Sequence, residues 1–298
     1  MARSSDSKGC VAAVGTFDGF HRGHRAIIGR VLDECHERGQ SGCVITFDNH
    51  PLSVIAPARA PQWAYPRTES ERLIREAGIE QVIKIPFTAE LKGLTAEEFM
   101  RHIRNEYGVE TLVMGYDNTF GSDRLTSPQQ YDAAGEAAGV RVINVPPVEL
   151  ADGSRPSSSA LRHALVQGDI DRYIQLSDHY PMLSGPVMHG KQNGRKIGIP
   201  TMNVDTGDLC LPEAGVYAAK FKGADGSRPA VLNVGKNPTV GPGNPVTVEL
   251  HVPDMELGDM YGKDIRFEIT RRIRPERRFS SLDELRRAIA ADIAASRE

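Results

Sequence analysis

The amino-acid sequence changes its pattern near residue 180, and this change limits the fold more than any other feature. Before it, apolar runs of strand length, rich in β-branched residues, alternate with segments whose apolar residues recur at helical spacing. The runs lie at 11–14, 42–47, 81–85, 111–114 and 140–145. Such alternation predicts an α/β domain in which a parallel sheet carries helices on both faces. Capping boxes of the form S/T-x-x-E, at Thr68 and Thr95, predict two of the helix starts.

After residue 180 the apolar runs follow one another without helices between them. Clusters of glycine, proline, aspartate and asparagine separate these runs, which lie at 185–190, 215–220, 229–234, 247–252 and 264–269. This pattern predicts an antiparallel barrel or sandwich. A third capping box, Ser281 with Glu284, precedes an amphipathic stretch and predicts a C-terminal helix.

The length of the chain, 298 residues, is sufficient for two domains with separate cores. We expect the first at 1–180, including a helical connection at 157–178, and the second at 181–298. Because each domain has its own pattern, we expect residues 181–298 to fold on their own.

Composition and charge exclude several classes of protein. No apolar run approaches the roughly 20 residues of a membrane span, and the polar residues 1–8 lack the apolar middle of a signal peptide, so we expect a cytoplasmic protein. The four cysteines show no C-x-x-C pair, which favours reduced thiols over a zinc site or disulfides. A net charge of −3 lacks the basic excess of a nucleic-acid binder. We therefore expect small-molecule ligands and neither nucleic acid nor membrane as partner; the oligomeric state stays open.

The stretch G-T-F-D-G-F-H-R-G-H, residues 15–24, joins the first predicted strand to the next helix. His21 and His24 are three positions apart and share one face of the first helical turn. A helix N-terminus favours phosphate, and two imidazoles add donors for oxygens that gain charge during phosphoryl or nucleotidyl transfer. The alternative is a histidine that only caps the turn. Glycines at 15, 19 and 23 favour the phosphate site, because they let the backbone approach a ligand closely.

Further stretches at 46–51, 115–121, 157–162 and 194–203 complete a larger pattern. Over nearly the whole chain it resembles the bacterial bifunctional riboflavin kinase/FAD synthetase (FMN adenylyltransferase) family. The resemblance implies an α/β nucleotidylyltransferase-type, Rossmann-like domain with a parallel sheet, followed by a mainly β riboflavin-kinase barrel with a C-terminal helix. It also implies two reactions with ATP: phosphorylation of riboflavin to FMN, and adenylylation of FMN to FAD with release of pyrophosphate.

For the adenylyltransferase half, the resemblance implies that His21, His24 and Arg162 hold the phosphates of ATP and stabilise the charge of the transition state. It implies a surrounding nucleotide- and phosphate-binding set, which is Gly15, Phe17, Asp18, Gly23, Asp117, Ser157 and Ser158. Without the resemblance, the serines read as an ordinary N-cap cluster.

For the kinase half, the resemblance implies that Thr201 and Asn203 bind Mg²⁺ with ATP, and neutral oxygens do suit this hard cation. Glu249 would be the base for the riboflavin hydroxyl. Strand alternation alone would instead predict that Glu249 is an outward-facing acid. A glycine-rich loop with Gly190, Gly194 and Arg195 would bind phosphate, although such a pattern alone is more typical of a β-turn.

Two alternative functions stay open. Many family members carry an aromatic residue where this chain has Asn118-Thr119, so one alternative is a riboflavin kinase with an impaired adenylyltransferase domain. Another is a flavin- or nucleotide-binding regulatory protein without turnover, which the presence of His24 and Glu249 disfavours.

A run of arginines near the C-terminus is interpreted as solvated surface, which is typical of such runs. It comprises Arg271, Arg272, Arg274, Arg277 and Arg278.

Overall fold

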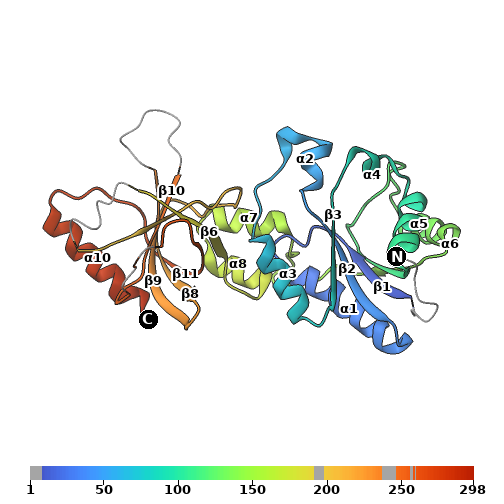
Figure 1. Ribbon diagram of the computed structural model, residues 1–298, viewed down its shortest axis with the longest axis horizontal. Coiled ribbons are helices and arrows are strands. Elements are labelled where there is room, and N and C mark those ends of the chain that lie inside the picture. Colours follow the sequence, from blue (N-terminus) through green and yellow to red (C-terminus); the bar gives the residue numbers. More distant parts are fainter. Residues whose placement is uncertain (1–8, 191–197, 237–245, 256–257, 259) are drawn as a thin grey trace. The chain divides into compact units, whose positions relative to one another are not determined.

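The structure is a computed structural model that describes residues 9–190, 198–236, 246–255, 258 and 260–298 (Figure 1). The chain forms two compact units, and neither unit is a single continuous segment. The first unit joins Met1–Pro61 to Arg67–Ser157, and the second joins Gln62–Pro66 to Ser158–Glu298.

The first unit is built on a parallel sheet of five strands in the order β3-β2-β1-β4-β5. The strands are β1 (Cys10–Val14), β2 (Ser41–Phe47), β3 (Gln81–Ile85), β4 (Val109–Gly115) and β5 (Arg141–Val145). Each lies where an apolar run predicted it, and β1 pairs in parallel with both β2 and β4. The carboxyl ends of these strands therefore form one edge, where ligands of open α/β sheets bind.

Helices cover both faces of this sheet, as the alternating pattern predicted. In β1, Val11 and Ala13 pack with Ile28 and Val31 of α1 (Arg22–Arg38), and α3 (Arg67–Glu76) lies on the same face. The remaining β1 residues pack on the opposite face against α5 (Ala96–Tyr107) and α6 (Pro128–Ala138). Short helical turns complete the unit, namely α2 (Pro51–Ile55), η1 (Pro57–Arg59) and α4 (Ala89–Gly93).

The second unit is a closed barrel in the strand order β10-β7-β6-β11-β8-β9, preceded by two helices and followed by one. The strands are β6 (Met182–Met188), β7 (Met202–Val204), β8 (Gly215–Gly223), β9 (Gly226–Lys236), β10 (Val246–His251) and β11 (Asp264–Arg274). The helices are α7 (Ser158–Val166), α8 (Ile170–Ser177) and α10 (Leu282–Ser296). An α/β domain with a parallel sheet followed by a β-barrel with a C-terminal helix is thus confirmed.

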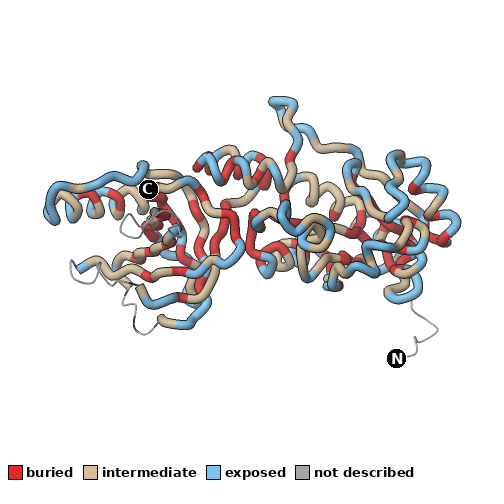
Figure 2. The backbone as a smooth tube through the Cα atoms, turned by 90° about the horizontal axis from the view of Figure 1, so that it is seen from above, coloured by how far each residue is buried: buried red, intermediate tan, exposed pale blue. Residues whose placement is uncertain are grey.

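A short piece from the first half of the chain completes the core of the barrel. Trp63 is 5% exposed and packs in the same apolar cluster as Ile170, Leu232 and Phe267. Its backbone donates to Asp208 at 2.9 Å and accepts from Cys210 at 2.8 Å. Buried residues follow the strands of both units (Figure 2). The Trp63 segment, residues 62–66, is therefore an integral part of the second unit.

The helices α7 and α8 group with the second unit, whereas the sequence placed them with the first domain. The boundary between the two functional domains at residue 180 stays a prediction. All four cysteines are free thiols, and three of them are buried. Among the described residues, the longest and most apolar helices still fall short of what a membrane crossing requires.

Candidate active sites

In the first unit, the turn from β1 into α1 has an unusual backbone. Phe17 and Phe20 have positive φ angles of 48° and 35°. A non-glycine residue in this region costs on the order of 1–3 kcal/mol. Both rings are buried, with 2% and 0% exposure, and burying a phenylalanine contributes about 1.5–3 kcal/mol. Burial of the two rings therefore offsets the backbone cost and holds the turn in one shape.

His21 and His24 lie together at the start of α1, as their spacing predicted. His21 is the N-cap residue, and its Nδ1 accepts from the backbone N–H of His24 at 3.4 Å. The two rings are stacked, with centroids 3.7 Å apart. Because Nδ1 of His21 accepts, the neutral ring carries its proton on Nε2 and remains a donor.

His24 is the less satisfied of the two histidines. Its Nδ1 atom is buried and has no hydrogen-bond partner among the residues that the structure describes. Burial and, secondly, the charge of His21 hold the pKa of the His24 ring well below its usual value. A neutral imidazole at a helix N-terminus that has no acidic residue in its first turn is suited to donate to an anion.

The rest of the turn packs closely around Gly23. A Cβ at Gly23 would lie 3.1 Å from the His21 ring, which would have to shift slightly, and 3.7 Å from the carbonyl oxygen of Pro156, which is an ordinary contact. Since Pro156 precedes Ser157, the predicted second phosphate-binding segment starts beside the histidines. Gly15 follows β1 and donates to Ile45 O at 3.1 Å, and Asp18 is 2% exposed.

Asn118, the departure from the family pattern, has a clear structural role. Its side-chain nitrogen donates to the carbonyl of Val14, the last residue of β1, at 2.8 Å. This bond joins the turn after β4, which carries the exposed Asp117, to the turn that leads to His21. An asparagine here therefore supports the carboxyl edge of the sheet.

Ser157 is the last residue of the first unit, whereas Ser158 and Arg162 belong to the second. Ser158 begins α7, and the guanidinium of Arg162 donates to Ser159 Oγ at 3.3 Å. Whether Arg162 acts with His21 and His24 stays a prediction.

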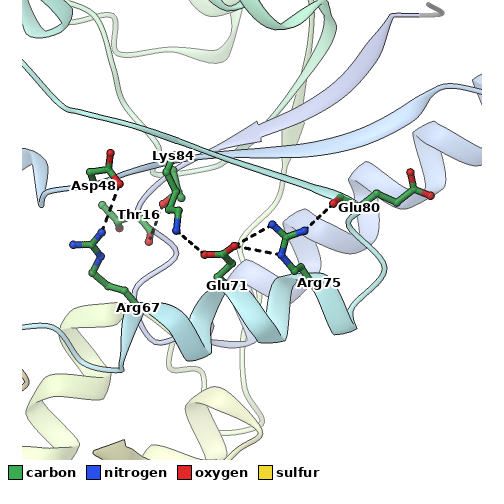
Figure 3. Close-up of polar contacts among 8 residues, drawn as sticks. Thr16, Asp48, Arg67, Glu71, Arg75, Glu80 and Lys84 are labelled. Atoms are coloured by element: carbon green, nitrogen blue, oxygen red, sulfur yellow. Dashed lines mark hydrogen bonds and ion pairs between the residues drawn. The ribbon is translucent and has the colours of Figure 1, made fainter. Parts of the chain in front are cut away.

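Charged pairs join α3 to β3 and to the loop that follows β2 (Figure 3). Lys84 contacts Glu71 at 3.0 Å, and Glu71 also binds Arg75. The capping box predicted for Thr68 and Glu71 is wrong: α3 already begins at Arg67, and Glu71 turns to the two cations instead. Each of these half-exposed pairs contributes little to stability, but together they hold α3 beside β3.

In the second unit, a cavity of about 630 Å³ lies between the barrel and α10. Its lining includes apolar side chains, among them Val216 and Val231 from the barrel and Leu285 and Ile289 from the helix. It also includes polar side chains, among them Glu249. A ligand with both apolar and polar parts matches this lining.

Glu249 is one of the polar residues that line the cavity. In the barrel it stands opposite Asn203 of β7 and opposite Asn233 of β9. Burial raises the pKa of its carboxyl, the hydrogen bond from Thr201 Oγ1 at 3.4 Å opposes this, and the charge of Glu276 raises it further. Val248 and Leu250 face the barrel core, so Glu249 lies on the outer face of β10, as strand alternation predicted. That face is covered by α10, and Glu249 therefore lines the cavity, which suits a base.

The residues expected to hold Mg²⁺ come from one strand: Asn203 lies in β7, and Thr201 lies directly before it. Oxygen-bearing side chains of Thr201, Asn203 and Glu249 gather there, and the described residues contain no cluster of three or more His, Cys, Asp or Glu that could bind a metal alone. Such a donor set fits a cation that takes further ligands from phosphates and water. A Cβ at Gly190 would lie 2.1 Å from the Asn203 amide, so glycine permits this contact. Gly194 and Arg195 lie outside the described residues.

The sequence reading missed an ion pair in the wall of this cavity. Arg274 was interpreted as part of a solvated basic run, but it lines the cavity and binds Asp292 of α10 through two bonds. That interpretation was wrong for Arg274. The signal that could have revealed the pair is Asp292 itself, because it shares the apolar helical face of Leu285 and Ile289 and needs a partner there.

Two protein-family models match successive parts of the chain. A family model described as FAD synthetase matches residues 3–160. A second, described as riboflavin kinase, matches residues 177–298.

Curated relatives span nearly the whole chain. The bifunctional riboflavin kinase/FMN adenylyltransferase of Pseudomonas fluorescens is 36% identical over 296 residues, which is 98% of this chain and 93% of the relative. The protein of that name from Escherichia coli strain K12 is 35% identical over 297 residues, with the same coverage of 98% and 93%. A solved structure named macrolide-efflux protein, from Streptococcus pneumoniae, is 28% identical, covers 99% of this chain and 95% of its own, and superposes with a TM-score of 0.87. The activity in that name is stated only of that protein.

Proposed function

This chain belongs to the bifunctional riboflavin kinase/FMN adenylyltransferase family, and on that premise we propose which residues carry each of its two reactions. The enzyme phosphorylates riboflavin to FMN and adenylylates FMN to FAD. The alternative of an impaired first domain finds no support, since both family models match and Asn118 has a structural role. A binding protein without turnover is likewise disfavoured.

The kinase reaction belongs to the cavity of the second unit. The flavin ring lies against apolar side chains of the cavity, and the 5′-hydroxyl of the ribityl chain reaches Glu249, which accepts its proton as the oxygen attacks the γ-phosphate of ATP. Thr201 and Asn203 would hold Mg²⁺, which neutralises charge on the phosphates when bound. The observation that carries this assignment is Glu249 itself, placed between two asparagines in a cavity large enough for riboflavin.

The adenylyl transfer belongs to the turn after β1. The phosphate of FMN attacks the α-phosphate of ATP, and pyrophosphate leaves without a covalent enzyme intermediate. His21 and His24 donate to the oxygens on which charge develops, while Gly15, Phe17, Asp18 and Gly23 form the turn that holds them. A wider set would complete the phosphate sites of the two reactions: Asp117, Ser157, Ser158 and Arg162 here, and Gly190, Gly194 and Arg195 in the kinase.

Product analysis of a variant tests the assignment. Glu249→Gln keeps the shape of the side chain and removes the base, and losing a general base costs about 10²–10⁴-fold in rate. We expect this variant to lose FMN formation from riboflavin, ATP and Mg²⁺, while it converts supplied FMN to FAD at the wild-type rate. Equal loss of both activities would contradict a dedicated kinase base, and FMN as the sole wild-type product would support the kinase-only alternative.

Location and partners complete the proposal. We propose that the enzyme works in the cytoplasm on ATP, riboflavin and FMN, without a nucleic-acid or membrane partner. The net charge of −3 lacks the basic excess of a nucleic-acid binder, and the free cysteines suit a reducing compartment. Cell fractionation with an antibody against the chain checks it, and recovery in the membrane fraction would contradict it.

A further inference from the structure

The C-terminal helix α10 turns one face towards the cavity of the second unit. Leu285, Ile289 and Asp292 follow each other at helical spacing and all line the cavity. The first two are apolar, but Asp292 is a carboxylate that is only 3% exposed. A buried charge is unfavourable unless it is paired. This face of α10 can therefore pack against the barrel only if Asp292 has a cationic partner.

That partner, Arg274, is the last residue of β11. Its Nε donates to Oδ1 of Asp292 at 2.9 Å, and its Nη2 donates to Oδ2 at 2.7 Å. The third nitrogen, Nη1, donates to the carbonyl of Pro275 at 3.2 Å. All three guanidinium nitrogens therefore have partners, and the pair joins α10 to the barrel in one defined geometry.

A second ion pair at the end of α10 provides a contrast. Arg297, the C-cap residue, contacts Asp254 at 2.5 Å, but the two side chains are 51% and 83% exposed. Neither of them lines the cavity. This pair also joins the helix to the barrel unit, yet it lies in solvent and has a single contact.

We propose that the Arg274–Asp292 pair positions α10 for riboflavin, by fixing the register in which Leu285 and Ile289 face the barrel. Apolar contacts alone leave a helix free to slide or rotate by a small amount, whereas two parallel N–H···O bonds are satisfied in one arrangement only. A buried ion pair adds little net stability over an apolar pair of similar volume. Its effect therefore appears in riboflavin affinity. The inference rests on the proposed kinase function of this cavity.

Four variants of the full chain test the proposal. Asp292→Asn removes the charge, Arg274→Lys keeps a charge but loses the two-bond geometry, and the double variant Arg274→Met/Asp292→Leu replaces the pair by apolar contacts. Asp254→Asn is the matched control at the exposed pair. For each, one measures kcat and the KM values of riboflavin and ATP in the kinase reaction, riboflavin binding without ATP by flavin fluorescence, the melting temperature, and FMN adenylylation.

We expect the three variants of this pair to raise the riboflavin KM and Kd roughly 10- to 100-fold, the scale of losing the contact of one buried apolar side chain with the ligand. Their kcat, ATP KM and FMN adenylylation should stay near wild type, and Asp254→Asn should change none of these values. The double variant should also keep the wild-type melting temperature, which separates positioning from folding.

Two results would overturn the proposal. One is wild-type riboflavin affinity in Arg274→Lys or in the double variant. The other is an equal loss of riboflavin and ATP affinity with a lower melting temperature in all three, which assigns the pair a purely structural role. Failure of the proposed function looks different, because then Glu249→Gln would still make FMN, or the wild-type chain would bind no riboflavin.

Discussion

The chemical properties of His24 depend on the residues packed around it. Spacing in the sequence predicted that it would share a helix face with His21, and the structure places the two rings in a stack. The unpartnered Nδ1 and the lowered pKa depend on buried neighbours, including Phe17 at a centroid distance of 5.1 Å. A sequence pattern carries no information on such burial, so these properties could not be predicted from it.

If His24 donates to oxygens that gain charge during AMP transfer, its loss slows that step alone. We expect His24→Ala to lower the FMN-to-FAD rate at saturating substrates by roughly 10²–10³-fold, as for one preorganised donor. Riboflavin phosphorylation should be spared. His36→Ala, an exposed histidine in the last turn of the same helix, is the control. A histidine that merely caps the turn would instead lower the melting temperature and leave turnover near normal.

The lowered pKa of His24 also predicts how stability depends on pH. In the unfolded chain a histidine titrates near 6.5, whereas folded His24 resists protonation. Below about pH 6.5 the unfolded state therefore binds more protons, and the first unit loses stability as the pH falls. We expect the decrease in melting temperature between roughly pH 7.5 and 5.5 to be smaller for His24→Ala than for wild type. An identical decrease would show that His24 does not contribute.

At the level of helices and strands, prediction succeeded where patterns were long and apolar. The strands of the parallel sheet and the box at Thr95 agree with the structure, because burial on both faces and capping both act locally. Strand β7 was missed since it has only three residues, Met202–Val204, and pairs with distant strands. The end of β11 was also missed, because the strand continues to Arg274 through a basic stretch. There, pairing with β8 in the barrel overrides the local polarity of the sequence.

The Trp63 segment gives a prediction at this level. Trp63 fills the barrel core from outside the continuous part of the second unit, and truncation of a buried tryptophan costs about 3–5 kcal/mol. We expect Trp63→Ala to lower the unfolding temperature of the second unit and its kinase activity at raised temperature. Trp63→Phe should retain most of both. Calorimetry that shows an unchanged transition for Trp63→Ala would contradict this.

For the whole molecule, the same packing limits how the enzyme can be divided. A piece of residues 181–298 lacks both Trp63 and Ile170, and a piece of residues 158–298 lacks only Trp63. We expect the melting temperature and the kinase activity to decrease in the order full chain, 158–298, 181–298. If 181–298 were as stable and active as the full chain, the outlying residues would contribute nothing to the barrel.

The discontinuous second unit also has a consequence for folding during synthesis. The parallel sheet is complete once β5 leaves the ribosome, so the first unit can fold while the barrel is still unmade. Trp63 then stays exposed to water without its packing partners. At a synthesis rate of 5–20 residues per second, the barrel strands follow on the order of ten seconds later. The nascent chain thus passes through a stage in which a folded domain displays an apolar loop, a feature that chaperones recognise and that the finished enzyme no longer shows.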